Sequence, residues 1–197
     1  MKLLGLTGGA GMGKSTAAAF LLQQGARVVD TDELARDLVQ PGQPALAEIR
    51  HEFGGGIFLP DGSLNRAALA GIVFAADSLR KKLEAILHPR IRERWLAQVE
   101  GWRRENCPLA VVIIPLLFET QAEAAFDKII CVACSASAQR DRLVARGWTP
   151  EQIRLRVAAQ MPVEQKLARS HFVVWSEGRP EVHRRQITQI LQKLQNL

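Results

Sequence analysis

Short apolar runs alternate with stretches of helical periodicity along this chain. The first run, residues 2–6, leads directly into glycines, and residues 15–24 are rich in alanine and leucine, as in an amphipathic helix. Near-continuous apolar strands that alternate with helices are typical of an α/β fold, in which a parallel sheet is flanked by helices on both faces. We predict strands at 2–6, 26–29, 109–114, 128–133 and 172–175, and helices at 15–24, 31–40, 44–53, 65–76, 77–104, 137–146, from Thr149 onward and from about Pro180 onward.

A mostly helical block separates the second predicted strand from the third. Gly54-Gly55-Gly56 and Asp61-Gly62 mark turns inside this block, and His88-Pro89 is expected to bend or split its longest helix. Because the block interrupts the alternation of strands and helices, we predict a helical insertion at the edge of the sheet.

Two of the later helices carry distinctive sequence patterns. At Thr149-Pro150-Glu151-Gln152 the threonine can cap the helix, the proline suits its first turn, and the glutamine completes a capping box. In the last helix the apolar residues recur at helical spacing, which predicts an inward-facing side. The residues expected on that side are Val182, Ile187, Ile190, Leu191 and Leu194.

Length and composition indicate a globular protein. The 197 residues are 47% hydrophobic and 23% charged, which excludes a disordered chain and, at about 150 residues per domain, a large multidomain enzyme or repeat array. The longest apolar run, 109–118, is interrupted by Pro115 and is shorter than the roughly 20 residues of a membrane span. The N-terminus lacks a signal-peptide pattern. We therefore expect a cytoplasmic protein with no membrane partner.

The charge balance favours an anionic partner. Lysine plus arginine exceeds aspartate plus glutamate by 26 − 20 = +6, and arginine, which suits bidentate recognition of phosphate, is the commoner cation. The charge alone does not separate a polynucleotide from a small polyphosphate, and the arginines can equally be solvated helix faces. The two arginine clusters are Arg90, Arg92, Arg94, Arg103 and Arg104, and Arg140, Arg142, Arg146, Arg154 and Arg156.

Three cysteines, Cys107, Cys131 and Cys134, form an odd set in a chain without an export signal, so we do not expect a disulfide framework. Cys131 and Cys134 have C-x-x-C spacing, but they lie in an apolar segment that reads as a buried strand, and there is no second pair of cysteines. We interpret them as structural thiols rather than zinc ligands.

The segment from Gly8 to Ser15 fits the phosphate-loop pattern G-x-x-x-x-G-K-[ST] and lies between a predicted strand and a predicted helix, the context that such a loop requires. Glycines let successive backbone N–H groups point at phosphate oxygens, and the helix start adds a positive dipole end. Lys14 would reach the β and γ phosphates of ATP, and the Ser15 hydroxyl would ligate Mg²⁺. The nucleotide-binding set is Gly8, Gly9, Ala10, Gly11, Met12, Gly13, Lys14, Ser15 and Thr16.

Other motifs narrow the class of nucleotide-binding protein. The N-K-x-D and D-x-x-G motifs of guanine-specific switches are missing from the sequence. The predicted strand at 109–114 is followed by Pro115, whereas large ATPases have an acidic residue at the corresponding strand end. Small kinases remain.

Asp30-Thr31-Asp32 follows the second predicted strand, whose carboxyl end should face a ligand crevice. Asp32 can take the proton of an attacking hydroxyl, and Asp30 can help to hold magnesium. The alternative is that Thr31 or Asp32 only caps the next helix.

Several segments together resemble the dephospho-CoA kinase family. They occur in the family's order and spacing and cover most of the chain, and their combination is far more specific than the phosphate loop alone. The matching segments are Thr7 to Thr16, Asp30-Thr31-Asp32 with Arg36, Leu87-His88-Pro89, Pro115-Leu116-Leu117-Phe118-Glu119 and Gln160-Met161-Pro162.

The resemblance implies the last step of coenzyme A synthesis, in which ATP phosphorylates the ribose 3′-hydroxyl of dephospho-CoA to give CoA and ADP. It also implies a P-loop kinase core at about 1–30, 107–136 and 170–197, a helical CoA-binding insertion at about 31–106 and a lid region at about 137–169, within one domain, 1–197.

By the same likeness Asp32 is the general base, Lys14 and Arg142 are catalytic, and Arg142 and Arg146 close over the phosphates. Asp32, Arg36, His88 and Glu119 would bind the substrate, and Ser15 and Asp30 the metal. His88 can instead be a helix-end residue, Glu119 a surface carboxylate, and the arginines solvated helix charge; Arg140 has no motif support.

The chain departs from the family pattern at two places. Thr31 replaces the usual small residue between the aspartates, and Ser170 to Gly178 differs from the family's segment after the last strand. We expect that loop to lie near the adenine, so Trp175 and Ser176 leave the adenine contacts undefined.

Two rival functions remain, a nucleoside or nucleotide monophosphate kinase and a nucleic-acid-binding ATPase. Our reading predicts neither a nucleic-acid partner nor an obligate protein partner.

Overall fold

Five apolar segments form one β-sheet in the computed structural model, which describes residues 1–195. The strand order is β2-β3-β1-β4-β5, and β1 runs parallel to both β3 and β4, as β4 does to β5. Because β1 lies in the middle, its residues after Lys2 are all buried, which explains its apolar sequence. The strands are β1 (Lys2–Thr7), β2 (Arg27–Asp30), β3 (Leu109–Ile113), β4 (Lys128–Ala133) and β5 (Phe172–Trp175).

The helices follow the predicted periodicity closely, with ends that shift by one or two residues. The exceptions are one short helix, α8, and two single 3₁₀ turns at Gly55–Ile57 and Glu123–Ala125, which we did not predict. The α-helices are α1 (Lys14–Gln23), α2 (Thr31–Leu38), α3 (Pro44–Phe53), α4 (Arg66–Ala75), α5 (Asp77–Arg104), α6 (Ala136–Ala145), α7 (Pro150–Ala158), α8 (Val163–Arg169) and α9 (Pro180–Gln195).

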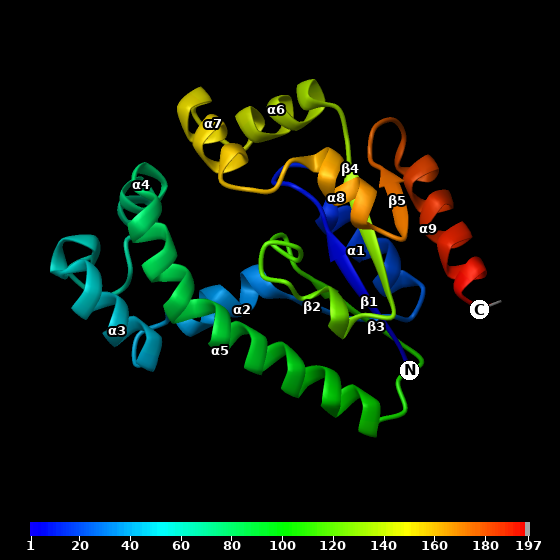
Figure 1. The fold of residues 1–197 in the computed structure, drawn as a ribbon, viewed down its shortest axis with the longest axis horizontal. Coiled ribbons are helices and arrows are strands. Elements are labelled where there is room, and N and C mark those ends of the chain that lie inside the picture. The colour runs from blue at the N-terminus through cyan, green and yellow to red at the C-terminus, as the bar shows by residue number, and fades with distance from the viewer. Residues whose placement is uncertain (196–197) are drawn as a thin grey trace. The chain divides into compact units, whose positions relative to one another are not determined.

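The chain divides into two compact units, one formed by Met1–Val29 with the residues from Gly101 onward and the other by Asp30–Glu100. The first unit holds the sheet, and α1 and α6 to α9 accompany it (Figure 1). The second unit is helical and has a core of its own, in which residues such as Ile49, Ile57 and Val73 are buried.

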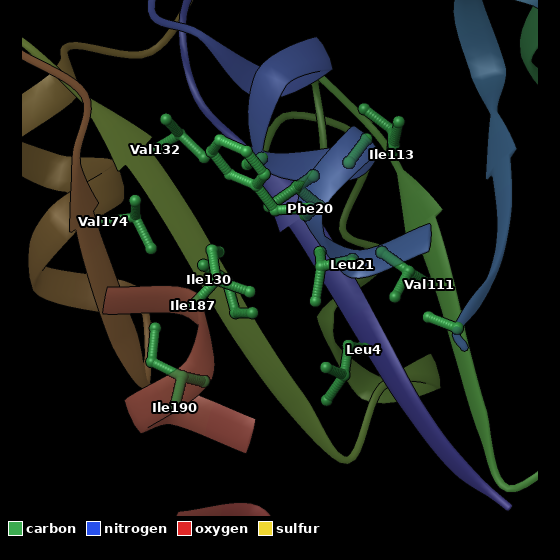
Figure 2. Packing of buried hydrophobic residues seen from close by; sticks show 14 of the residues in the cluster. Leu4, Phe20, Leu21, Val111, Ile113, Ile130, Val132, Val174, Ile187 and Ile190 are labelled. Carbon is green, nitrogen blue, oxygen red and sulfur yellow. The ribbon is translucent and has the colours of Figure 1, made fainter. Parts of the chain in front are cut away.

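Helices α1 and α9 cover one face of the sheet. Phe20 and Leu21 from α1 and Ile187 and Ile190 from α9 pack on apolar side chains of the four strands β1, β3, β4 and β5 (Figure 2). The prediction that Val182 lies on the inner side of α9 is wrong, since this residue is 52% exposed. His183, one helical turn before Ile187, takes the inner position instead and meets the Phe20 ring edge-on.

The other face of the sheet is covered by the segments after β3 and by α8. A Cβ atom at Gly5 of β1 would lie 2.7 Å from Leu117 Cδ1, so this glycine gives the covering side chain its room. Val163 and Leu167 of α8 pack near Cys134, just beyond the end of β4. Helices on both faces of a parallel sheet confirm the predicted α/β class.

Helix α5 runs continuously through Pro89, so of the two expected outcomes, a bend or a split, the split does not occur. Proline removes one backbone hydrogen bond and loosens the preceding turn. The Arg90 guanidinium donates to the Ile86 carbonyl at 2.6 Å and supplies a donor to that turn.

Strand β5 forms an edge of the sheet, and the side chain of Gln186 in α9 lies against it. Gln186 Oε1 accepts from the Trp175 N–H at 2.8 Å, and Gln186 Nε2 donates to the Trp175 carbonyl at 2.9 Å. The amide thus takes both backbone groups of the last residue in the edge strand.

Candidate active site

The glycine-rich loop joins β1 to α1 at the carboxyl end of the central strand. Gly8, Gly11 and Gly13 have φ values of 141°, 74° and 93°, a region that favours glycine. A Cβ atom at Gly8 would also lie only 2.3 Å from the Val132 carbonyl oxygen. Both the backbone shape and the tight packing therefore require glycine in this loop, as the motif predicts.

Helix α1 begins without a side-chain cap. Gly13 is its N-cap residue, and no acidic residue lies in its first turn. The first N–H groups of a helix lack intrahelical partners, and the dipole there is positive. Ser15 and Thr16 are exposed in this turn. Such a helix start is suited to binding an anion such as a phosphate group.

Lys14 bends back over the loop. Its ammonium group donates to the Gly8 carbonyl at 2.9 Å and to the Gly9 carbonyl at 3.0 Å. The positive charge is thus held beside the loop backbone, where the motif predicts it.

Arg142 of α6 ties the loop to the segment that follows β5. Its guanidinium donates to the Gly11 carbonyl at 3.3 Å, to Ser176 Oγ at 2.8 Å and to the Ser176 carbonyl at 2.6 Å. The structure therefore brings Arg142 to the loop. Arg146, by contrast, is exposed at the end of α6.

Two glutamines that were not among the predicted site residues hydrogen-bond the peptide units beside Ala10. Gln139 Nε2 donates to the Ala10 carbonyl at 2.7 Å, and Gln160 Oε1 accepts from the Ala10 N–H at 3.2 Å. Gln160 belongs to a segment that carries the family resemblance, but only its tertiary contact shows what it does. Gln139 gave no motif signal.

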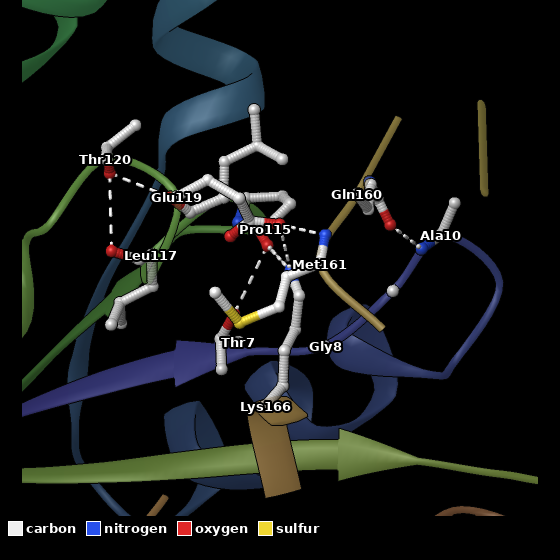
Figure 3. A network of polar contacts seen from close by, with 12 residues as sticks. Thr7, Gly8, Ala10, Pro115, Leu117, Glu119, Thr120, Gln160, Met161 and Lys166 are labelled. Atoms are coloured by element: carbon white, nitrogen blue, oxygen red, sulfur yellow. Dashed lines mark hydrogen bonds and ion pairs between the residues drawn. The ribbon is translucent and has the colours of Figure 1, made fainter. Parts of the chain in front are cut away.

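Glu119 lies in a buried polar network at the carboxyl ends of β1 and β3 (Figure 3). Its Oε1 atom accepts from the Met161 N–H at 2.8 Å and lies 2.8 Å from the Lys166 ammonium. The Glu119 side chain is 21% exposed, so the alternative of an ordinary surface carboxylate is wrong.

Asp30 and Asp32 adjoin the carboxyl end of β2. Asp30 Oδ1 accepts from the Asp32 N–H at 2.8 Å and caps α2, so the capping residue is neither Thr31 nor Asp32. Asp32 and Arg36 are both exposed on α2. The side chain that caps α2 is therefore that of Asp30.

His88 lies inside α5, so the alternative of a helix-end residue is wrong. It is partly buried, and desolvation lowers the pKa of its imidazole, with a smaller opposing effect from Glu84. The ring therefore favours the neutral form.

Cys131 and Cys134 are buried, in keeping with a strand and its end. Burial raises the pKa of the Cys131 thiol to about 11, although Lys166 opposes the shift. Within residues 1–195, no three His, Cys, Asp or Glu side chains cluster as a metal site would require.

The chemistry of the loop fits a magnesium nucleotide. The loop can offer backbone amides and an ammonium group as donors to an anion. Mg²⁺ prefers oxygen ligands, and the exposed Ser15 hydroxyl is one such group. The Asp30 carboxylate, at the end of β2, is another. None of the helices in the described part of the chain is long and apolar enough to span a membrane.

Comparisons with known proteins agree with this geometry. A family model described as dephospho-CoA kinase matches residues 2–181. The dephospho-CoA kinase of Anaeromyxobacter dehalogenans is 46% identical over 182 residues, which are 92% of this chain and 86% of the relative. That of Geobacter sulfurreducens is 43% identical over 194 residues and covers 98% of each chain. The solved dephospho-CoA kinase from Campylobacter jejuni has a TM-score of 0.70 and 25% identity, with 98% of each chain covered.

Proposed function

The chain belongs to the dephospho-CoA kinase family, and we propose how its residues share the work of that reaction. The enzyme phosphorylates dephospho-CoA with ATP in coenzyme A biosynthesis. The phosphoryl group goes to the ribose 3′-hydroxyl, and the products are CoA and ADP. For a kinase that acts on these substrates we propose a cytoplasmic location.

The phosphate loop binds the ATP tail. The observation that carries this proposal is the α1 start, where positive-φ glycines, a helix without a side-chain cap and the Lys14 ammonium lie together. Positive groups held together beside a site stabilise the negative charge that develops there. The residues proposed to contact the ATP tail are Gly8, Gly9, Ala10, Gly11, Met12, Gly13, Lys14, Ser15 and Thr16.

Ser15 and Asp30 are the residues that we propose to hold Mg²⁺. When bound, the ion would supply positive charge that offsets the negative charge developing on the phosphate groups. Asp30 would hold the ion in addition to capping α2 through Oδ1.

Arg142 supports the loop and contributes positive charge. An arginine has five N–H donors in a fixed fork, and Arg142 directs part of that fork to Gly11 and Ser176. Its remaining donors and the exposed Arg146 are the proposed contacts to phosphate oxygens.

Asp32 is the proposed general base. It is an exposed carboxylate two residues beyond the end of β2, and the ligands of parallel α/β sheets bind at the carboxyl ends of the strands. A carboxylate that accepts the proton of the attacking hydroxyl assists an in-line transfer. Arg36, His88 and Glu119 are proposed to bind and orient the acceptor.

A coupled assay of ADP release tests this function across a panel of acceptors. We expect turnover with dephospho-CoA and none with an analogue that lacks the ribose 3′-hydroxyl. Turnover with nucleosides or nucleoside monophosphates, and none with dephospho-CoA, would show that the chain is a different small-molecule kinase.

A second arm of the same assay adds single- and double-stranded nucleic acid at low salt. A nucleic-acid-dependent ATPase would hydrolyse ATP faster, and its binding would weaken steeply with salt. We expect no stimulation.

A further inference from the structure

Lys166 is a fully buried lysine that no sequence motif pointed to. Its side chain is 0% exposed, and its ammonium donates to the Pro115 carbonyl at 2.6 Å and pairs with Glu119 Oε1 at 2.8 Å (Figure 3). Both acceptors lie in the segment that follows β3. An ammonium group loses much hydration on burial and persists only with such partners. Lys166 therefore fixes α8 to the carboxyl end of β3.

The two oxygens of Glu119 differ sharply in their surroundings. Oε1 interacts with two donors, the Lys166 ammonium and the Met161 N–H. Oε2 is buried and has no hydrogen-bond partner in the described part of the chain. A buried carboxylate oxygen without a donor is costly, since it has lost its water. One oxygen is thus fully engaged, while the other is left to accept a donor from outside the protein.

The network adjoins the phosphate loop on two sides. The Pro115 carbonyl also accepts from Thr7 Oγ1 at 3.3 Å, and Thr7 is the residue before Gly8. Gln160, the neighbour of Met161, bonds the Ala10 N–H. A ligand bound at the loop would therefore come close to the network that holds Glu119.

We propose that Lys166 is a positioning residue for phosphoryl transfer: it holds Glu119 through Oε1 so that Oε2 accepts a hydrogen bond from an O–H group of the bound ligands. The inference rests on the proposed function, because that O–H group belongs to the acceptor or to a water on the magnesium ion. The two sources offer the same donor chemistry.

A purely structural role would leave Oε2 unexplained. If the pair only fastened α8, an apolar pair of similar volume would serve as well, and burying two charges would bring no advantage. The asymmetry between the oxygens favours a role toward a ligand.

The test compares Glu119→Gln, Lys166→Met and the double variant with the unaltered protein. Arg154→Met is the matched control, since it breaks an ion pair with Glu151 that is exposed on α7. For each protein, thermal unfolding, kcat and KM are measured. Calorimetry measures the binding of Mg·ADP, metal-free ADP and dephospho-CoA separately.

Each single change leaves a buried group without its partner, so we expect a lower melting temperature for Lys166→Met. The double variant removes both charges and should melt within about 3 °C of the unaltered protein. Its kcat should nevertheless stay about a hundredfold low, as should that of Glu119→Gln. If Glu119→Gln alone folds poorly, the double variant still shows whether kcat falls in a protein of near-normal stability.

The binding data identify the source of the O–H group. A dissociation constant for dephospho-CoA about tenfold higher points to the acceptor hydroxyl, and a rise confined to Mg·ADP points to a metal-bound water. If both kcat and the melting temperature recover in the double variant, the Glu119–Lys166 pair only attaches α8, and the proposal is overturned. Unchanged affinity for both ligands in Glu119→Gln would do the same. If the unaltered protein fails to phosphorylate dephospho-CoA, the proposed function fails, while Mg·ADP binding still tests Oε2.

Discussion

The Ser176 hydroxyl donates to the Met12 carbonyl across 2.7 Å, although the two residues come from opposite ends of the chain. The contact joins the segment after β5 to the phosphate loop. Ser176 also sets the space beside Gly13, where a Cβ atom would lie 3.0 Å from Ser176 Cβ. The segment in which this chain departs from its family pattern thus helps to shape the loop.

We expect Ser176→Ala to weaken ATP binding. The change removes the donor to Met12 and the acceptor that Arg142 uses, and it should cost about 1–2 kcal/mol of stability. The dissociation constant for ATP should rise roughly tenfold. Titration calorimetry measures it, with Ser137→Ala on the exposed start of α6 as the control. Unchanged ATP affinity would show that the loop keeps its shape without this contact.

Gly8→Ala should destabilise the protein strongly. The new methyl group would collide with the Val132 carbonyl, and φ is 141°. We expect a loss of about 3 kcal/mol or more in the free energy of unfolding. Gly25→Ala is the control, since φ is 83° but nothing lies within 4 Å of its Cβ position, and it should cost about 1 kcal/mol. Equal losses in denaturant titrations would rule out the steric explanation.

Asp32→Asn should reduce kcat by about a hundredfold or more, because an amide cannot accept the acceptor's proton. ATP affinity should change by less than about twofold. Asp37→Asn on the same helix is the control, since Asp37 is also exposed. Steady-state kinetics together with ATP binding separate the two effects. A near-normal kcat would remove Asp32 from the role of general base.

The protein should lose stability as the pH falls below about 6.5, partly through His183. Burial lowers the pKa of this histidine from its ordinary 6.5, and the Arg142 charge adds to the effect. The unfolded chain therefore binds a proton in a pH range where the folded chain does not, so stability rises with pH across that range.

His183→Leu should flatten this dependence. The difference in free energy of unfolding between pH 7.5 and 5.5 is the quantity to compare, with the exposed His51→Leu as the control. His88, whose pKa burial also lowers, remains in both variants. An equally steep dependence in His183→Leu would assign the effect elsewhere.

Local sequence signals predicted most of the fold. The capping box at Thr149 and Gln152 formed as expected, because its contacts join residues three apart. Apolar runs located the strands for a similar reason, since a central parallel strand is buried on both faces. Val182 was wrong because helical spacing alone does not say which residue of a turn faces the sheet.

The candidate site was less predictable wherever it depends on distant partners. A lysine in a short helix is ordinarily exposed, and Lys166 is buried only because Glu119 and Pro115 meet it in the folded chain. Gln139 and Ser176 contact the phosphate loop from other elements, and no spacing rule links them to it. The loop's glycines were predictable because one continuous sequence motif contains them.

The side chain of Gln186 has a consequence for self-association. An edge strand offers its outward N–H and C=O groups to any strand of another molecule, a common start of aggregation. At Trp175 both groups are already occupied by the glutamine amide, next to the exposed ring and Val173. A second sheet that approached along β5 would have to displace Gln186 first, so this single side chain hinders edge-to-edge polymerisation.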